Sequence, residues 1–333
     1  MRLKQPSHSL AKLGGFSLIA VLMLGVGFFG SRPAEANHPV LVEGNCDSPV
    51  PGITSVGVAG GPASGGNSSL ATSGGICGDY DGDGRIGTAE DTDGADRIFG
   101  TINAALGPGT GAAAGTGANQ NGLVRIVASG RFAESVFIGR ANIVPPYGSA
   151  SPGHVTLEAA PGVHAIIDAV LQGDPGGNNI QRQNGPGILI FYLPSEGDRR
   201  VTLRNLTIRN FSTGIETSGV SVEVVDCRLE NNLEYGIRTG GNSRLVVLNS
   251  EVVNTGFRIG QASSVPREGE GIRINQATAK LVNTNVSYSY GAGIHNALPS
   301  ATALTLYKVS SFFNAGGNIV GPATICTDVA PCQ

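Results

Sequence analysis

The sequence predicts an all-β solenoid, in which a short block of strands recurs along the chain and its copies stack on one another. A motif of alternating apolar residues, an Asn or Asp, and a Gly-Ile pair recurs between residues 201 and 318. Gly accounts for 51 of 333 residues, charged residues make up only 14%, and Trp is absent. Many turns and small side chains suit a solenoid better than a helical or doubly wound fold.

Residues 1–36 are predicted to be a secretory signal peptide. Basic residues precede an apolar run over residues 13–30, and Ala34-Glu35-Ala36 is the small-x-small pattern that signal peptidase recognises. An uncleaved membrane anchor is the alternative, because a run of 18 residues is close to the minimum for a span. No later stretch is apolar enough to cross a bilayer. We therefore expect a mature chain without a transmembrane span, exported to the periplasm or the extracellular space.

The charge of the mature chain excludes one class of partner. Removal of residues 1–36 takes away four basic side chains and one acidic one, which leaves 18 basic and 24 acidic side chains. Binding to nucleic acid or to anionic lipid depends on clustered Lys and Arg. We therefore expect neither to be a partner.

Five cysteines follow the predicted signal, and an odd number in an exported chain leaves one thiol unpaired if the others form bridges. Cys46 and Cys77 flank a Gly/Ser-rich loop, and Cys326 and Cys332 flank a short tail, so we expect these two local disulfides. Cys227 lies inside a repeat and is expected to be a small buried side chain.

Residues 37–94 are predicted to form a leader that carries an EF-hand-like calcium loop at residues 79–90. The twelve-residue pattern places carboxylates at positions 1, 3, 5 and 12, a glycine at position 6 and a backbone carbonyl ligand at position 7. No helix can precede it, since the chain there reads GGICG, so the loop resembles the calcium loops of extracellular modules. Because the loop is single, a structural role for Ca²⁺ is expected; an acidic turn without metal is the alternative. The predicted ligands are Asp79, Asp81, Asp83, Arg85 and Glu90.

Residues 95–322 are predicted to form the solenoid and residues 323–333 a disulfide-tied tail. At the start, the apolar residues between Ala95 and Leu106 have the i, i+3, i+4, i+7 spacing of an amphipathic helix. Its apolar face needs a partner, and the open end of a solenoid needs a cover. We therefore expect a short capping helix at the amino-terminal end.

An alignment of the last five copies predicts which residues share a position in successive coils. Asn side chains at the bends are expected to hydrogen-bond along the column and to satisfy backbone groups that leave the sheet. The Gly before each Ile is expected to permit a tight turn. The aligned columns are Asn205, Asp226, Asn249, Asn283 and Val309; Ile208, Leu229, Val252, Val286 and Phe312; and Asn210, Asn231, Asn254, Tyr288 and Asn314.

The Ile of the Gly-Ile pair recurs at intervals of 27, 22, 35, 22 and 25 residues. A period near 22 with tolerated insertions is typical of stacked β coils, because each coil returns to the same place while its loops vary in length. A polar insertion around residues 261–270 accounts for the longest interval. The recurring residues are Ile188, Ile215, Ile237, Ile272, Ile294 and Ile319, the last of which follows Asn318 in place of a Gly.

These repeats resemble the right-handed parallel β-helix proteins of the pectate-lyase-like superfamily, in particular secreted bacterial proteins with parallel β-helix repeats. The resemblance covers about residues 95–322. It implies a right-handed parallel β-helix of about seven coils with a short N-terminal capping helix. It implies no single activity, because the superfamily includes lyases, hydrolases, adhesins and proteins without known chemistry.

The residue after each recurrent Ile should point outward, which places one line of side chains on one face of the solenoid. Four consecutive members are Glu216, Arg238, Arg273 and His295, flanked by Leu189 and Val320. We favour a solvated ladder of balanced charges over a catalytic face, because surface charge is ordinary on such sheets. Arg209 with Glu230, and Arg228 with Glu251, form similar ladders elsewhere.

Several enzyme signatures are missing. The chain has no adjacent aspartates, no Gly-His-Gly element, and no Trp for the signature of the pectate lyases. We therefore expect a secreted or envelope-associated protein with a non-catalytic glycan-binding or structural role, whose partner is a polysaccharide or cell-surface glycan. The alternative is a lyase for uronate polymers that uses Arg238, Arg273 and His295. A third possibility is an adhesin or assembly subunit that self-associates with calcium.

Overall fold

The computed structural model divides into two compact units, Met1–His38 and Pro39–Gln333, and every residue it describes lies in the second. The predicted signal peptide (residues 1–36) and the predicted calcium loop (residues 79–90) are not among the described residues. No helix among those residues is long and apolar enough to cross a membrane. The described residues are 40–43, 54–55, 97–106, 122–139, 154–169, 185–192, 199–256 and 269–327.

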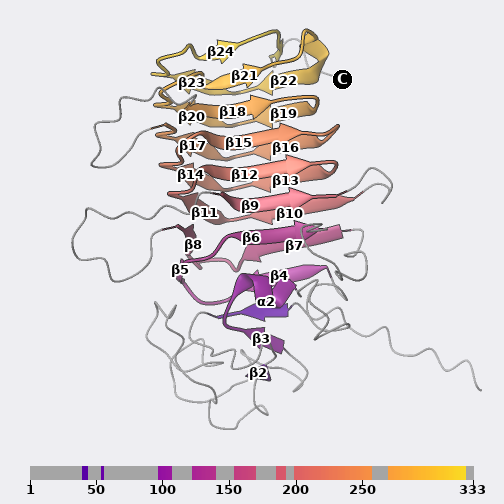
Figure 1. The fold of residues 1–333 in the computed structure, drawn as a ribbon, viewed down its shortest axis with the longest axis vertical. Coiled ribbons are helices and arrows are strands. Elements are labelled where there is room, and N and C mark those ends of the chain that lie inside the picture. The colour runs from indigo at the N-terminus through magenta and orange to yellow at the C-terminus, as the bar shows by residue number, and fades with distance from the viewer. Residues whose placement is uncertain are drawn as a thin grey trace, which may run out of the picture. The chain divides into compact units, whose positions relative to one another are not determined.

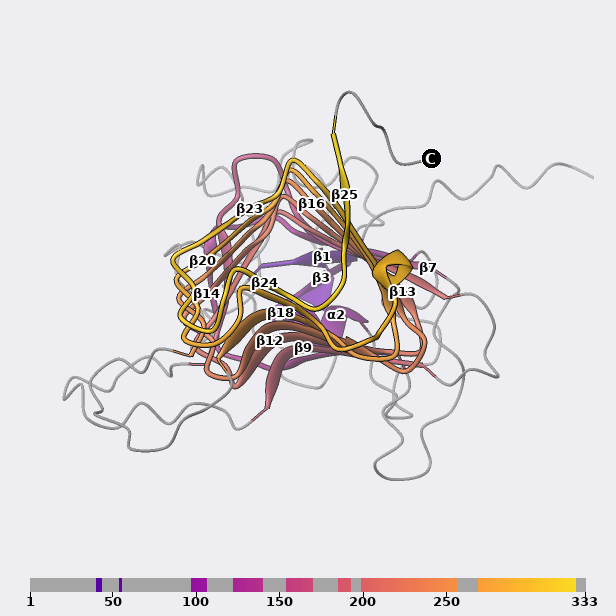
Figure 2. The same cartoon turned by 90° about the horizontal axis from the view of Figure 1, so that it is seen from above.

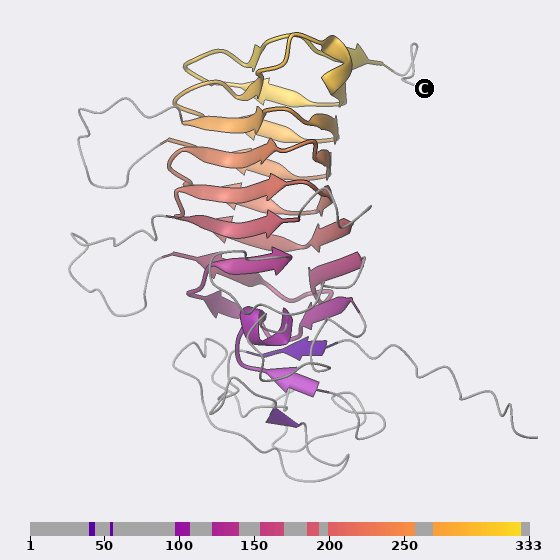
Figure 3. The same cartoon turned by 45° about the vertical axis from the view of Figure 1, so that its right-hand side comes forward.

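Three sheets form the walls of a solenoid, and Figures 1 and 3 show their strands stacked coil upon coil. Sheet 1 has eleven strands, and its pairings are parallel except the one between β2 and β3. In stacking order they are β2 (Thr54–Ser55), β3 (Arg97–Phe99), β1 (Val40–Val42), β4 (Leu123–Ile126), β7 (His154–Ala159), β10 (Arg200–Arg204), β13 (Ser221–Val225), β16 (Arg244–Leu248), β19 (Thr278–Val282), β22 (Leu304–Tyr307) and β25 (Thr324–Cys326).

Sheets 2 and 3 have seven strands each, all parallel. Sheet 2 consists of β5 (Gly130–Phe132), β8 (Ala165–Asp168), β11 (Leu206–Arg209), β14 (Arg228–Glu230), β17 (Glu251–Val253), β20 (Asn285–Ser287) and β23 (Ser310–Phe312). Sheet 3 consists of β6 (Val136–Gly139), β9 (Pro186–Phe191), β12 (Thr213–Ser218), β15 (Tyr235–Gly240), β18 (Glu270–Ile274), β21 (Ile294–Asn296) and β24 (Ile319–Val320). A 3-10 helix, η2 (Ala301–Ala303), precedes β22.

Each coil runs from sheet 1 to sheet 2 to sheet 3, so the seven strands of the smaller sheets confirm the predicted seven coils. The inward side chains form continuous aliphatic columns. The Gly-Ile register is confirmed: Ile215 pairs with Ile188 and Ile237, and all three are fully buried. No coil could bury these side chains alone, so stacking supplies the core.

The amino-terminal helix is shorter than predicted. Within the helix expected over residues 95–106, Arg97–Phe99 form the strand β3 and only Ile102–Leu106 form a helix, α2, so the prediction was wrong for residues 97–99. Two long-range interactions explain the difference. Strand β1, from the predicted leader, pairs with β3 on one side and β4 on the other. The Glu134 carboxylate accepts hydrogen bonds from the backbone N–H groups of Ile102 and Asn103, which fixes where the helix begins.

The predicted capping role of this segment agrees with its packing. Ile102, Ala105 and Leu106 of α2 are buried in the core, and α2 contacts β1, β3, β4 and β6. Figure 2, seen along the stack, shows α2 within the outline of the coils. Burial of the Glu134 carboxylate raises its pKa above the ordinary value, although the hydrogen bonds from Ile102 and Asn103 oppose this shift.

The Asn-rich columns are corners where the backbone turns with positive φ. Asn205 (φ 56°) lies between β10 and β11, and Asn210 (φ 66°) follows β11. Asn tolerates this left-handed region better than most residues, which explains its recurrence. Hydrogen bonding along the column, the predicted reason, is present between Asn283 and Asn249, with 2.9 Å from Nδ2 to Oδ1.

The predicted alignment of the last coil was wrong by one residue. Val282 pairs with Tyr307 and Val286 with Ser311, so Lys308 and Phe313 occupy the two corners, with φ of 52° and 56°. Val309, Phe312 and Asn314 therefore each lie one position beyond the predicted column. The shift arose because the last coil has no Asn at either corner to mark the register.

The glycines before the recurrent Ile are required for a different reason from the one predicted. Their φ angles are not positive. A Cβ on Gly214 would lie 2.5 Å from the carbonyl oxygen of Gly236, and one on Gly236 would lie 2.6 Å from that of Gly271. The glycine column therefore allows successive coils to approach closely.

Cys227 is buried in the core, as predicted, and shares a column with Leu206 and Ser250. Its Sγ lies 3.2 Å from the carbonyl oxygen of Val225. Burial raises the pKa of this thiol to about 12, so it is protonated at neutral pH. The predicted disulfides involve Cys46, Cys77 and Cys332, which lie outside the described residues, so both pairings remain predictions.

Candidate functional site

The outward side chains of sheet 3 form the line that the Gly-Ile spacing predicts. Glu216 pairs with Leu189 and Arg238, Arg238 with Arg273, Arg273 with His295, and His295 with Val320. The period of two explains this arrangement: Ile272 and Ile274 of β18 are buried, whereas Arg273 between them points outward. Five consecutive coils therefore present Glu216, Arg238, Arg273 and His295 after the apolar Leu189.

Glu216 and Arg238 form a surface ion pair. The Arg238 Nη1 lies 3.4 Å from Glu216 Oε1, and both side chains are substantially exposed. Exposed pairs of this kind stabilise a protein by about 0–1 kcal/mol. This contact agrees with the charge-balance interpretation of the line.

Glu270 organises the other half of the line, and the sequence alone did not identify it. Its carboxylate lies 2.7 Å from His295 Nδ1 and 3.2 Å from Arg273 Nη1, while the residue is only 7% exposed. Arg273 also donates from Nε to Asn275 Oδ1 at 3.2 Å. A single buried acid thus holds the basic side chains of two successive coils.

Glu270 lies at the corner where β18 begins, in the column of Tyr235. The sequence alignment did not assign Glu270 to a column, because Glu270 ends the polar insertion that accounts for the 35-residue interval. The signal that could have located it is its place two residues before the recurrent Ile272, equivalent to Tyr235 before Ile237.

Tyr235 lies beside the two arginines of the line. Its ring centroid is 5.4 Å from Cζ of Arg238 and 5.9 Å from Cζ of Arg273. Cation–π contacts at these distances stabilise the guanidinium positions by about 0.5–1 kcal/mol at exposed sites. The half of the line at Arg238, Arg273 and His295 is therefore held by carboxylates, an amide and an aromatic ring.

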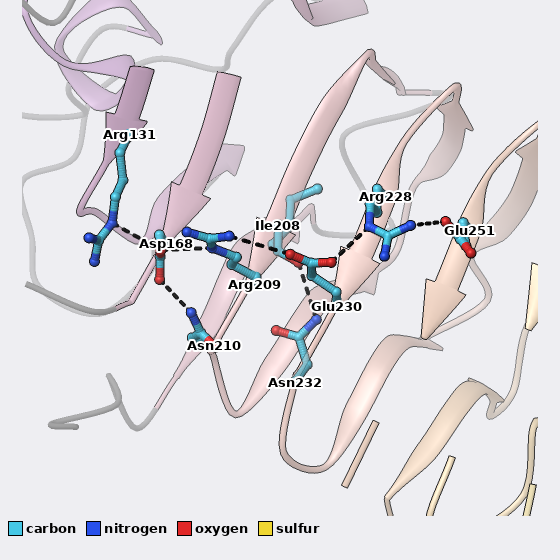
Figure 4. A network of polar contacts seen from close by, with 9 residues as sticks. All are labelled: Arg131, Asp168, Ile208, Arg209, Asn210, Arg228, Glu230, Asn232 and Glu251. Atoms are coloured by element: carbon cyan, nitrogen blue, oxygen red, sulfur yellow. Dashed lines mark hydrogen bonds and ion pairs between the residues drawn. The ribbon is translucent and has the colours of Figure 1, made fainter. Parts of the chain in front are cut away.

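Sheet 2 carries a second polar network on its outer face, shown in Figure 4. Asp168 is 1% exposed, and its Oδ2 lies 2.8 Å from Arg209 Nε and 2.9 Å from Arg131 Nε. Its Oδ1 accepts a hydrogen bond of 2.8 Å from Asn210 Nδ2. Asp168 of β8 thus binds Arg131 of β5 and Arg209 of β11, which belong to the coils before and after its own.

The network continues through the two predicted ladders, which are confirmed as ion pairs. Arg209 pairs with Glu230 at 3.4 Å, and Arg228 pairs with Glu230 at 2.7 Å and with Glu251. Burial lowers the pKa of Arg209, but Asp168 and Glu230 outweigh this effect, so its pKa is raised overall. Each charge is neutralised by its neighbours, which fits a structural role.

Amide side chains beside the second corner bind backbone groups. Asn232 Oδ1 accepts from the N–H of Phe211 at 3.1 Å, and its Nδ2 donates to the carbonyl of Ile208 at 3.4 Å (Figure 4). Asn314 makes the equivalent contacts with Ser289 and Val286. In the first aligned column, Asn205 Nδ2 likewise lies 3.4 Å from the carbonyl oxygens of Ala160 and Val163. The predicted use of amides to satisfy backbone groups is therefore confirmed at the first corner, and at the second corner it occurs one residue after the aligned column.

The predicted metal ligands Asp79, Asp81, Asp83, Arg85 and Glu90 lie outside the described residues, so Ca²⁺ binding remains a prediction. Across the parts of the chain that the structure describes, no group of three or more His, Cys, Asp or Glu side chains could hold a metal ion. The outer line on sheet 3 is the candidate site that remains.

The three parallel sheets define a parallel β-helix, and a family comparison agrees. Residues 160–306 match the family described as "Right handed beta helix region", which covers less than half of the chain. Among solved structures, the crystal structure of pectate lyase Pel9A is similar, with 14% identity and a TM-score of 0.32 over 63% of this chain and 70% of that one. A likeness of this extent carries no information about activity. No curated protein matches the chain.

Proposed function

We propose that this chain is a secreted or envelope-associated β-helix protein that binds a polysaccharide or cell-surface glycan without cleaving it. The binding face is the outer line on sheet 3, around Arg238, Arg273 and His295. The observation that carries the proposal is the cluster around Glu270, which joins Arg273 and His295 beside the Tyr235 ring. Fixed donors and acceptors next to an aromatic ring suit a ligand that has many hydroxyl groups.

The charges on this face favour a neutral or weakly anionic glycan. Glu216 and Glu270 balance Arg238 and Arg273, and each arginine is within 3.4 Å of a carboxylate. A face that captured polyuronate by charge would need unpaired cations, because each existing pair must be broken or shared when a new anion binds. The same pairing supports a non-catalytic role, since a base that abstracts a proton needs free access to it.

Binding is tested by calorimetric titration of the full chain with neutral and uronate oligosaccharides. Arg273→Ala should weaken binding about tenfold, the loss expected for one hydrogen bond to a charged group. Arg228→Ala is the matched control, because it removes an ion-paired arginine from sheet 2 and should leave affinity unchanged. Absence of binding to every glycan, or equal losses in the two variants, would contradict the proposal.

The second candidate is a lyase for uronate polymers, favoured by one contact. The Glu270 carboxylate lies 2.7 Å from His295 Nδ1, and a carboxylate that orients an imidazole is a common arrangement for a general base. Incubation with uronate polymers would then release unsaturated products that absorb ultraviolet light. If the wild type released such products and the His295→Ala and Arg273→Ala variants did not, the lyase function would be supported and the non-catalytic proposal would be wrong.

We also propose that Ca²⁺ binds at residues 79–90 and stabilises the chain, on the sequence pattern alone. Calcium should release heat in a titration and raise the melting temperature. Asp81→Ala should abolish both effects, whereas Asp226→Asn, at a corner of the solenoid, should preserve them. A titration without heat and without a melting shift would remove calcium from the proposal.

A further inference from the structure

Three aromatic side chains gather at the second corner of the last two described coils. Tyr288 occupies this corner after β20, and Phe313 occupies it after β23, which Phe312 ends. The ring centroids of Tyr288 and Phe313 are 5.3 Å apart in a stacked arrangement, and Phe312 packs edge-on at 6.1 Å from the first and 5.3 Å from the second. Figure 1 shows β23 next to β20 in the stack. The three rings form one cluster, which we call the aromatic platform.

The aromatic platform is exposed to solvent. Tyr288 is 47% exposed, Phe312 36% and Phe313 71%. Single exposed apolar side chains are ordinary on a protein surface, whereas contiguous ones mark places of contact with a ligand or a partner. Because the rings pack on one another, little side-chain freedom is left to be lost when a ligand binds to them.

The backbone of the platform would be better served by other residues. Earlier coils place Asn210, Asn231 and Asn254 at the same corner, with φ between 55° and 66°. Tyr288 and Phe313 adopt φ of 57° and 56° there, which no other aromatic residue in the described part of the chain does. Positive φ is a true outlier for a bulky side chain, and such conformations concentrate at functional sites. The rings therefore have a role beyond forming the corner.

The platform borders the proposed binding face, because its corner connects sheet 2 with sheet 3. Tyr288 precedes His295 by seven residues in the same coil, which is at most about 24 Å of extended chain. Ser310 is exposed on the same outward face of β23 as Phe312, and it adds a hydroxyl group beside the rings. A glycan of several sugars is long enough to contact both the platform and His295.

We propose that the aromatic platform stacks against one ring of a neutral glycan built from hexopyranoses with equatorial hydroxyl groups. The hydroxyl groups of such a sugar lie at its rim, so each face presents C–H groups, which suit the apolar, weakly negative face of an aromatic ring. The platform thus supplies apolar contact, and the line around Arg273 supplies hydrogen bonds. This inference rests on the proposed glycan-binding function and adds the class of sugar and a second point of contact.

The test is calorimetric titration of the full chain with cellohexaose, a neutral β-linked glucose oligomer. Phe313→Asn should weaken binding about tenfold through loss of the apolar contact. Its melting temperature should equal or exceed that of the wild type, because Asn is the residue that earlier coils place at this corner. Phe313→Tyr keeps a ring and should bind like the wild type. Ile325→Ala, the matched control, removes a 68% exposed apolar side chain from sheet 1 and should also leave affinity unchanged.

Tyr288 reports the contact independently of affinity. In the full chain labelled with fluorotyrosine, the fluorine NMR signal that is missing from Tyr288→Phe belongs to Tyr288. This signal should shift as cellohexaose is added. It should also shift in Arg273→Ala, at higher cellohexaose concentration, because the platform is intact in that variant.

Several outcomes would overturn the inference: unchanged affinity in Phe313→Asn, a clear fall in its melting temperature, an equal loss of affinity in Ile325→Ala, or a Tyr288 signal that does not shift. Tighter binding of oligogalacturonate than of cellohexaose would overturn the class of sugar. Self-association that is lost in Phe313→Asn, without any glycan binding, would assign the rings to a protein contact instead. Loss of affinity in Arg273→Ala but not in Phe313→Asn would contradict the platform alone, and the reverse would contradict the sheet 3 face alone.

Discussion

Glu270 and His295 come from successive coils, and their side chains meet at 2.7 Å on the outer face of sheet 3. The pair is 25 residues apart in the sequence, and Arg273 joins it through the other carboxylate oxygen at 3.2 Å. The buried acid therefore helps to position basic side chains from two successive coils. The cluster is therefore both a stabilising contact and the centre of the proposed binding face.

Removal of the Glu270 charge should cost more stability than removal of the Glu216 charge. Glu270→Gln leaves Arg273 and His295 without their shared carboxylate in a partly desolvated setting, and should lower the free energy of unfolding by about 1–3 kcal/mol. Glu216→Gln breaks an exposed pair and should cost about 0–1 kcal/mol. Urea unfolding curves at the same ionic strength measure both; equal costs would show that burial of Glu270 contributes nothing.

Asp168→Asn should be the most damaging single change in the sheet 2 network. The substitution removes the negative charge between Arg131 and Arg209, and breaking a buried pair in this way costs about 3–5 kcal/mol. Glu251→Gln, at the exposed end of the same network, should cost about 0–1 kcal/mol. The two variants are compared by thermal and urea unfolding. A small effect at Asp168 would indicate that solvent replaces its contacts.

Asn231 tests the explanation of the corner columns. Its φ of 57° is disfavoured for residues with a Cβ. Asn231→Ala should therefore cost about 1–2 kcal/mol, whereas Asn231→Gly should be close to neutral because glycine adopts positive φ freely. If both variants lost the same stability, side-chain contacts rather than backbone conformation would explain the Asn.

Glu134 should make stability depend on pH in a defined direction. Its pKa in the folded chain is raised above 4.5, so its contribution is fully present below the unfolded pKa and is lost as pH rises through the folded pKa. Glu134→Gln lacks this titration. The stability of the Gln variant relative to wild type should therefore increase as pH rises from about 4.5. Unfolding midpoints of both proteins across this range provide the measurement, and a constant difference would contradict it.

Cys227 should not react in the folded protein. Its thiol is 3% exposed and its pKa is raised to about 12. Iodoacetamide at neutral pH should leave the peptide that contains Cys227 unmodified, and addition of urea should allow rapid alkylation. Peptide mass spectrometry follows the single site. Modification without denaturant would show that the coil around Cys227 opens in the native state.

The regular parts of this fold were predictable because they repeat. The Ile188 to Ile319 column and the outward line from Leu189 to Val320 follow from alternation and from a spacing near 22 residues. Both signals are local or periodic, and the hydrogen-bonded register reproduces them. The last coil was misaligned because Lys308 and Phe313 replace the Asn residues that mark its corners.

The parts that could not be predicted depend on contacts distant in the sequence. The first turn of α2 is set by Glu134, more than 30 residues later, and β3 is a strand because β1 pairs with it. Glu270 joined the candidate site only when the register placed it beside Tyr235. Amphipathic spacing describes one element at a time, so it does not report a carboxylate or a strand supplied from elsewhere.

The parallel stacking of successive coils also sets how the molecule would respond to a pulling force. Each strand between the ends is hydrogen-bonded to the coil before it and the coil after it, so a load on the last coil reaches the interior only after that coil detaches. Coils should peel off singly from that end. A coil of about 22 residues would release roughly 75 Å of extended chain, and the coil that contains the 35-residue interval would give a longer step in the force trace.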